Sequence, residues 1–404
     1  MDKTIVLTIE KLAGLGDGVG HLDGQRIFVP YTLPGDVVRA RVIRTTKDAV
    51  YASLEDIITQ GNARAVPVCR HFTHCGGCSL QHVDSETYLG FKQQMAREAV
   101  KKAGFNPDCV EHIVQIPPVS RRRVELKIAD GRLGYYAEHS HNLVGIEECK
   151  VLEPALEELI LRLKPELIAM LGLSAIQINR VDEGYDIVLT GEKVTQWHVA
   201  SEREILRVSV QEKGKFRTLY QSGQVAITLG GLKVEIPPGV FLQASRQAQM
   251  VMTQRVLVAV GQSKHVLDLF AGIGTYSFPL TSCAEVTAVE GDGTMVAAMQ
   301  QAALQHGLKQ RLKASQRDLF HSPVDRLDVY DAVVINPPRV GAKEQIKILA
   351  GSSVKKLVMV SCNPATFSRD ARALREGGYI LNKVLPVDQF VYSSHLEMIA
   401  EFSR

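Results

Sequence analysis

The stretch HVLDLFAGIGT, residues 265–275, decides the fold, because an apolar run ends there in a glycine-rich loop. The run is predicted as a buried strand, and Gly272 and Gly274 let a ligand approach the backbone closely. Glu290 ends the next apolar run, about 20 residues beyond Asp268, where an acid hydrogen-bonds a nucleoside ribose. A tight strand-to-helix turn explains the two glycines alone equally well. The loop lacks the third glycine of the dinucleotide fingerprint and the Lys of a phosphate-binding loop.

Around this stretch, residues 239–404 alternate strand and helix in the rhythm of a Rossmann-like α/β domain. The pattern predicts strands at residues 265–270, 285–290, 329–336 and 356–360, and helices at 297–303 and 343–349.

Cys362 stands between the apolar strand at 356–360 and an Asn-Pro turn that opens a helix. This order holds a thiol at the carboxyl edge of a sheet, where open α/β folds place their chemistry. A helix N-terminus favours the thiolate, which is the reactive form. A buried structural cysteine is the alternative for a thiol considered alone.

The loop Asn336-Pro337-Pro338-Arg339 ends another predicted strand and presents backbone carbonyls beside the cofactor. Enzymes that methylate exocyclic amines of bases carry an aromatic residue after such a loop, where this chain has Arg339. RNA cytosine-C5 enzymes place a Cys in that loop, which this chain lacks. The loop therefore argues against both of these groups of methyltransferases.

Composition indicates a globular protein of two or three domains, with 404 residues, 45% hydrophobic residues, 23% charged residues and a net charge of +3. The sequence has no signal peptide and no apolar run long enough to span a membrane, so we expect a cytoplasmic protein without a membrane partner. Seven cysteines in a reducing compartment indicate metal binding or catalysis rather than disulfides.

Residues 1–58 are predicted to form a small β-barrel, because short alternating strands are separated by Gly and Pro turns. A series of basic side chains in this segment faces either an RNA phosphate backbone or only solvent: Arg39, Arg41, Arg44 and Lys47.

Residues 59–238 are predicted to form a central mixed α+β domain that contains a cysteine motif, C-x5-C-x2-C, at Cys69, Cys75 and Cys78. Residues 85–104 have the pattern of an amphipathic helix that ends at a glycine, and residues 154–171 that of a helix interrupted at Pro165. The basic run at residues 121–123 is either an RNA contact or an ordinary strand end.

The chain resembles RNA uracil-C5 methyltransferases of the iron–sulfur kind that bear a TRAM domain and act on 23S ribosomal RNA. The barrel segment resembles the OB-like TRAM domain, and the likeness extends over essentially the whole chain. It rests on the cysteine motif, Cys149, the glycine loop, the Pro-Pro-Arg loop and three further motifs: FLQAS at 241–245, SCNP at 361–364 and HLE at 395–397. The resemblance implies a class I S-adenosylmethionine methyltransferase domain behind a TRAM barrel and a central iron–sulfur domain. The helix at 85–104 would then pack with the catalytic domain.

The resemblance also assigns roles to individual residues. The Cys362 thiolate would add to uracil C6, so that C5 attacks the methyl group of S-adenosylmethionine, and Glu397 would remove the C5 proton. A solvated surface carboxylate is the alternative for Glu397. The residues that would line the S-adenosylmethionine site are Gln243, Phe270, Thr275, Glu290, Asp318 and Asn336. Two positions depart from the family pattern, with Ser245 in place of Asn and Asn336 in place of Asp.

By the same resemblance, Cys69, Cys75, Cys78 and Cys149 would hold a [4Fe–4S] cluster. Tetrahedral zinc uses the same four thiolates and is the alternative from spacing alone. The remaining Cys109 and Cys283 are expected in the core. We expect an RNA partner, ribosomal before transfer RNA, and a monomer. An RNA-binding scaffold without catalysis is the competing hypothesis.

Overall fold

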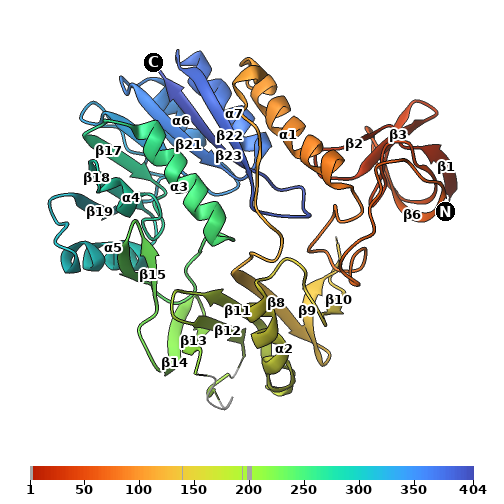
Figure 1. The fold of residues 1–404 in the computed structure, drawn as a ribbon, viewed down its shortest axis with the longest axis horizontal. Coiled ribbons are helices and arrows are strands. Elements are labelled where there is room, and N and C mark those ends of the chain that lie inside the picture. Colours follow the sequence, from red (N-terminus) through yellow and green to blue (C-terminus); the bar gives the residue numbers. More distant parts are fainter. Residues whose placement is uncertain (1–2, 139, 193, 198–202) are drawn as a thin grey trace. The chain divides into compact units, whose positions relative to one another are not determined.

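The computed structural model describes residues 3–138, 140–192, 194–197 and 203–404, which form two compact units (Figure 1). Unit 1 holds the residues up to Met95 together with Gly134–Lys150 and Phe390–His395. Unit 2 holds Ala96–Leu133, Val151–Gln389 and Leu396–Arg404. The boundary expected near residue 238 does not separate the units, because one hydrophobic core runs from Val225 through Val240 to Ile399.

Unit 1 begins with the predicted barrel, drawn in red in Figure 1. Its six strands lie in the order β1-β5-β6-β4-β3-β2, and the Glu10 amide donates to the Val19 carbonyl at 2.8 Å, which links the end of β1 to β3. Alternate residues such as Ile5, Leu7 and Val38 fill the interior. The strand bounds are β1 Thr4–Thr8, β2 Lys11–Leu12, β3 Gly18–Leu22, β4 Gln25–Val29, β5 Val37–Thr45 and β6 Val50–Thr59.

The basic series on β5 is largely paired within the barrel. Arg39 and Arg41 approach Asp56 and Glu55 of β6 at 3.5 and 3.4 Å, and the Arg44 guanidinium lies 4.5 Å from the centre of the Tyr51 ring. The side chains of Arg39 and Arg41 remain about half exposed, so these ion pairs leave them accessible to solvent.

Beyond the barrel, unit 1 contains the cysteine segment, the first part of helix α1 (Ser85–Lys102) and a hairpin. In the hairpin, β10 (Leu143–Gly145) pairs antiparallel with β9 (Arg132–Tyr136). Gly134 of β9 is required by packing, since a Cβ there would lie 1.8 Å from the Val144 carbonyl oxygen.

Unit 2 contains a central sheet and a catalytic sheet. The central sheet has the order β8-β11-β12-β13-β14, and helix α2 packs on β8 and β11. Helix α2 continues through Pro165, so the predicted interruption is wrong, and its buried face is lined by leucines and Ile160. The bounds are β8 Arg123–Ala129, α2 Pro154–Ala169, β11 Leu173–Arg180, β12 Tyr185–Gly191, β13 Ile205–Glu212 and β14 Lys215–Gln221.

The catalytic sheet has the order β19-β18-β17-β20-β21-β23-β22-β7. The strands from β19 to β21 are parallel, and β23 runs antiparallel between β21 and β22. This confirms the predicted Rossmann-like rhythm. The strand bounds are β7 Val114–Gln115, β17 His265–Leu269, β18 Glu285–Glu290, β19 Leu312–Gln316, β20 Ala332–Ile335, β21 Lys356–Ser361, β22 Ile380–Asp388 and β23 Glu397–Ser403.

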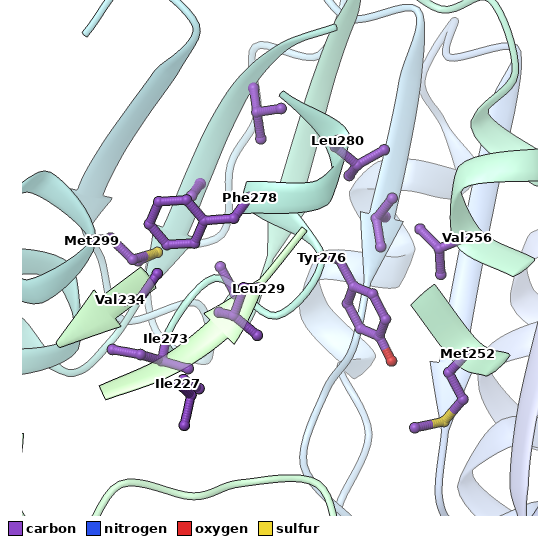
Figure 2. Close-up of a cluster of buried hydrophobic side chains, with 14 of the residues drawn as sticks. Ile227, Leu229, Val234, Met252, Val256, Ile273, Tyr276, Phe278, Leu280 and Met299 are labelled. Carbon is purple, nitrogen blue, oxygen red and sulfur yellow. The ribbon is translucent and has the colours of Figure 1, made fainter. Parts of the chain in front are cut away.

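Helices α3, α4 and α5 share one apolar core with this sheet. Phe278 of α4 and Met299 of α5 point toward each other, and Leu229 and Val234 lie beside them (Figure 2). The last two belong to the hairpin β15–β16, whose two-residue turn, Gly230-Gly231, has positive φ at both positions, as a type I′ turn requires. The bounds are β15 Ala226–Leu229, β16 Leu232–Glu235, α3 Arg246–Val260, α4 Ser277–Leu280 and α5 Gly293–Gln305.

Helices α6 (Lys343–Ala350) and α7 (Pro364–Glu376) pack against each other, and α7 also contacts the end of α1. The Ser368 hydroxyl donates to the Ala99 carbonyl at 2.9 Å, and Arg375 donates to the Gly104 carbonyl at 3.2 Å. The C-terminal part of helix α1 and the residues after it are therefore bonded to α7. A short 3-10 helix, η1, spans Pro107–Cys109. Among the described residues, no helix is long and apolar enough to cross a membrane.

Candidate active site

The carboxyl ends of the parallel strands meet at one edge of the catalytic sheet. Leu269 pairs with Val289 on β18 and with Ile335 on β20. The residues that follow these three positions, Phe270, Glu290 and Asn336, therefore lie at the same level of the edge. The sequence analysis predicts that all three residues line the cofactor site.

The loop after β17 has an unusual backbone. Phe270, Gly272 and Gly274 have φ values of 58°, 58° and 87°, in the left-handed region that glycine adopts most readily. A Cβ on Gly272 would meet no atom within 4 Å, whereas one on Gly274 would lie 2.8 Å from the Phe278 ring. The loop is thus packed on its inner side at Gly274 and open at Gly272, which leaves room for a ligand against the backbone.

Glu290 organises this loop from the end of β18. One carboxylate oxygen accepts from the Gly272 amide at 2.9 Å, and the other accepts from the Gly291 and Asp292 amides at 2.7 and 3.0 Å. The carboxylate therefore connects the two loops between which a nucleoside would lie.

Two other predicted cofactor residues lie at the margin of the edge. Asp318, after β19, is exposed; its Oδ2 lies 2.8 Å from His321 Nδ1, and the hydrogen bond from His321 lowers the pKa of this carboxyl. The neighbouring Phe320 ring lies 5.4 Å from the ring of Phe270. Thr275 is half-buried at the end of the glycine loop.

Cys362 directly follows β21, and Asn363 caps helix α7 by accepting from the Ala365 amide at 3.0 Å. Glu397 is the first residue of β23, and the neighbouring pair Ser361 and Met398 brings it beside Cys362. Only 5% of Glu397 is exposed, so the alternative of a solvated surface carboxylate is wrong.

Arg339 completes this group from the loop after β20. Its guanidinium lies near enough to the Cys362 thiol to lower the pKa of that thiol. Its backbone carbonyl accepts from Asn363 Nδ2 at 3.1 Å and from the Thr366 hydroxyl at 3.2 Å, which fixes the loop to the first turn of α7. The Pro-Pro-Arg loop therefore delivers a cation next to the thiol.

Burial has the largest effect on the pKa values of Cys362 and Glu397. Burial raises the pKa of the Cys362 thiol, the Glu397 charge raises it further, and Arg339 opposes both. The helix N-terminus was expected to favour the thiolate, but burial and the Glu397 charge outweigh the groups that do so, and the pKa of the thiol lies above its ordinary value. Burial also raises the pKa of Glu397 to about 7, against the hydrogen bond from Gln389 and the charge of Arg339.

Gln389, at the end of β22, joins Glu397 to Gln243. Its Nε2 donates to Glu397 Oε1 at 2.8 Å and to Gln243 Oε1 at 3.0 Å. Gln243 is held from behind by Arg122, whose Nε donates to its backbone carbonyl at 3.1 Å. Arg122 is 2% exposed and also bonds Gln249, so this member of the basic run at 121–123 is a structural residue rather than an RNA contact.

The base of the site contains two further buried polar groups. Asp268 accepts from the Ser277 hydroxyl at 2.6 Å, and burial raises the pKa of its carboxyl to about 7. The Tyr276 hydroxyl has no hydrogen-bond partner in the described part of the chain. Burial raises the pKa of this phenol, and so do the charges of Glu397 and Asp268.

The four predicted ligand cysteines all belong to unit 1 and interact with one another. Burial, together with the charges of Cys69 and Cys149, raises the pKa of Cys75 to about 11 and that of Cys78 to about 12. The Gly77 amide donates to the Cys75 sulfur at 3.4 Å. Among the described residues, however, no group of three or more His, Cys, Asp or Glu side chains is arranged as a metal site.

The cysteine segment is also bonded to the loop that connects β22 and β23. The Tyr392 carbonyl accepts from the Ser79 and Leu80 amides at 2.9 and 3.0 Å, and the Tyr392 amide donates to the Tyr88 hydroxyl at 3.0 Å. Lys92 donates to the His395 carbonyl. These bonds hold Phe390–His395 within unit 1.

Sequence reasoning missed the roles that three residues have in the site. Arg339 stands in the Pro-Pro-Arg loop at a strand end. A role could have been predicted for it, because a positive charge at that edge of the sheet lies near the thiol that follows the next strand. Gln389 directly follows a strand, but that strand was not predicted. Arg122 contacts residues more than 100 positions away, and nothing in its local sequence distinguishes it from Arg121 or Arg123.

Comparison with known proteins identifies the family. A family model described as tRNA (uracil(54)-C(5))-methyltransferase, TRAM domain, matches residues 5–61, and one described as tRNA (Uracil-5-)-methyltransferase matches residues 315–402. An uncharacterized RNA methyltransferase of Caulobacter vibrioides is 36% identical over 98% of this chain and 99% of its own length. The 23S rRNA (uracil(1939)-C(5))-methyltransferase RlmD of Pseudomonas putida is 30% identical over 98% of this chain and 93% of its own length.

The chain belongs to the RNA uracil-5-methyltransferase family. It is an RNA uracil-C5 methyltransferase, and S-adenosylmethionine is its methyl donor. The fold agrees, since the tRNA (uracil-54, C5)-methyltransferase of Pyrococcus abyssi, solved with S-adenosyl-L-homocysteine, superposes with a TM-score of 0.78 at 23% identity. The superposition covers 98% of this chain and all of that one. The predicted family, enzyme class, TRAM domain and methyltransferase fold are confirmed.

Proposed function

We propose that this enzyme methylates C5 of a uridine in 23S ribosomal RNA, with Cys362 as the nucleophile and Glu397 as the base. The observation that carries the proposal is the group at the sheet edge. A thiol, a buried carboxylate and an arginine come from three different strand ends and act on one another electrostatically.

The chemistry requires these groups because uracil C5 is a weak carbon nucleophile. Addition of the Cys362 thiolate to C6 forms a C–S bond and makes C5 electron-rich, so that C5 would take the methyl group from the donor sulfonium, whose S–CH3 bond breaks to leave a neutral thioether. Glu397 then accepts the C5 proton, the C5–H electrons form the C5–C6 double bond, and the C–S bond breaks to return the thiolate. The target base has to leave its stack to meet a thiol at the sheet edge.

S-adenosylmethionine supplies the electrophilic methyl group, and the glycine loop with its neighbours would hold it. Glu290, already bonded to three loop amides, would exchange part of this bonding for the ribose hydroxyls. Asp318 would reach the adenine edge after its His321 contact opens. The remaining residues proposed to line the pocket are Gln243, Phe270, Thr275 and Asn336.

The cysteine segment fits a thiolate-bound metal group by the chemistry of its donors. We assign Cys69, Cys75, Cys78 and Cys149 to a [4Fe–4S] cluster, which would organise the segment structurally. Gly76, between the thiols, lets the segment pack closely against the hairpin, since a Cβ there would lie 2.8 Å from the Tyr136 carbonyl oxygen. Zinc uses the same donors and is the alternative.

The ribosomal substrate is favoured over transfer RNA by the relative from Pseudomonas putida, which is named as a 23S rRNA methyltransferase and aligns over 93% of its length. We further propose that residues 1–58, 59–238 and 239–404 act as the TRAM, iron–sulfur and methyltransferase parts of a monomeric cytoplasmic enzyme.

Nucleoside mass spectrometry of ribosomal and transfer RNA, from cells with and without the gene, tests the substrate. Loss of 5-methyluridine from the large ribosomal RNA is the expected result. Loss confined to transfer RNA would overturn the ribosomal assignment. Complementation with Cys362→Ala, which should not restore the nucleoside, tests the nucleophile in the same cells.

A further inference from the structure

Gln389 occupies a position that the proposed mechanism leaves without a role. It is 4% exposed, and the two hydrogens of its single amide nitrogen go to two different residues, Glu397 and Gln243. Its Oε1 is buried and has no hydrogen-bond partner in the part of the chain that the structure describes. Burying an amide oxygen without a hydrogen-bond partner destabilises the folded protein. Because Gln389 carries this cost, we looked for a function in the two contacts that its nitrogen makes.

We propose that Gln389 is a positioning residue for removal of the C5 proton: its Nε2 keeps Glu397 ionised and orients the second carboxylate oxygen toward the substrate. This inference rests on the proposed role of Glu397 as the base.

The geometry supports this role in two ways. Gln389 occupies Oε1 of Glu397, so Oε2 is the oxygen that remains to take the proton. A hydrogen bond donated to a carboxylate favours its ionised form, which a base must have before it can accept a proton. The bond opposes the burial that raises the pKa of Glu397.

The surroundings of Glu397 offer few substitutes for this bond. The ionisable groups that interact with its charge come from three other elements: Arg339 after β20, Cys362 after β21 and Tyr276 after β17. Arg339 is the cation among these three, and its charge acts on both the thiol and the carboxylate. Gln389 thus supplies the hydrogen bond that the carboxylate receives within the described residues.

The test variant is Gln389→Met, which keeps the length of the side chain and removes both N–H groups. Gln345→Met is the matched control. Gln345 is a fully buried glutamine on α6, and among the described residues its amide bonds the backbone of Val324 alone, at 2.8 and 3.0 Å. Both variants lose a buried amide, so thermal melting compares their stability costs.

Two rates are measured for each protein from pH 6 to pH 9.5. The first is methylation of a uridine-containing RNA fragment. The second is formation of the covalent adduct with the same RNA carrying 5-fluorouridine, in which C5 holds fluorine and cannot lose a proton. Both pass through Cys362 and methyl transfer, so their ratio isolates proton removal.

The ratio of methylation to adduct formation should fall at low pH, where Glu397 becomes protonated, and we call this fall the acid limb. In Gln389→Met we expect the midpoint of the acid limb to move up by about one to two pH units, because the carboxylate loses a hydrogen bond. Below the limb, methylation should fall on the order of 10- to 100-fold while adduct formation stays within about twofold of wild type. Gln345→Met should leave the ratio unchanged. Gln389→Glu, a second variant of equal size, should move the limb in the same direction.

An unchanged ratio in Gln389→Met, or adduct formation slowed as much as methylation, refutes the inference while Glu397 stays the base. Normal methylation by Glu397→Gln would instead overturn the proposed base, and the inference with it. The two failures are therefore distinguishable.

Discussion

Replacing Glu397 with Gln should stabilise the protein at alkaline pH while blocking proton removal. The amide has the shape of the carboxylate, and its carbonyl oxygen can still accept from Gln389 Nε2. The substitution removes the negative charge of the Glu397 carboxylate, which is unfavourable at this buried position. In the folded protein the pKa of Glu397 rises from 4.5 to about 7.

The sign and size of the effect follow from this difference in pKa. Because the folded state binds the proton more tightly, the stabilising contribution of protonated Glu397 is present below pH 4.5 and is lost as the pH rises to about 7. At ~1.4 kcal/mol per pH unit, wild type loses about 3 kcal/mol over this range, and Glu397→Gln keeps it. Relative to wild type, the variant should therefore gain little stability near pH 4.5 and about 3 kcal/mol at pH 8.

Urea unfolding of both proteins at pH 5 and pH 8 gives the difference directly. Glu376→Gln, at an exposed position on α7, serves as the control and should show no pH-dependent gain. If Glu397→Gln gains no more stability at pH 8 than at pH 5, the buried ionised carboxylate is refuted.

Three further substitutions test other parts of the site. Cys362→Ala should lose methylation altogether yet bind S-adenosylmethionine normally by calorimetry; residual turnover would exclude this thiol as the nucleophile. Glu290→Ala should weaken S-adenosylmethionine binding by about 10- to 100-fold, since three loop amides lose their acceptor along with the ribose contact, and unchanged affinity would contradict that assignment. Cys149→Ser should reduce the bound iron measured by elemental analysis, whereas zinc in the wild-type protein in place of iron would favour the alternative metal.

Much of the active-site edge could be predicted because the carboxyl ends of parallel strands converge. The apolar runs that end at Phe270, Glu290 and Asn336 were sufficient to predict that these residues lie at one level of the sheet edge. The pairing of β17 with β18 and with β20 confirms this prediction. Cys362 and Glu397 follow the same logic, since each borders a strand that the sequence pattern indicated. Strand ends carry this information because sheet geometry leaves little freedom there.

The network behind that edge could not be predicted. Gln243 and Gln389 are 146 residues apart, and their contact depends on β22, which was not recognised as a strand. Arg122 had the appearance of a surface charge, because its burial results from packing against the chain around Gln243 rather than from its own strand. Long-range contacts of polar side chains leave no local pattern.

The ionisation states of Cys362 and Glu397 are coupled in a way that suits the order of the reaction. The charge of Glu397 raises the pKa of Cys362, and by reciprocity a thiolate at Cys362 disfavours ionised Glu397. In the proposed mechanism the two anions are needed at different steps, because the thiolate acts first and the carboxylate acts last. Once the sulfur is bonded to C6 it carries no charge, so its repulsion of Glu397 disappears. Arg339, released from the thiolate at the same moment, can then act on the carboxylate alone. The base is therefore easiest to ionise when the C5 proton has to leave.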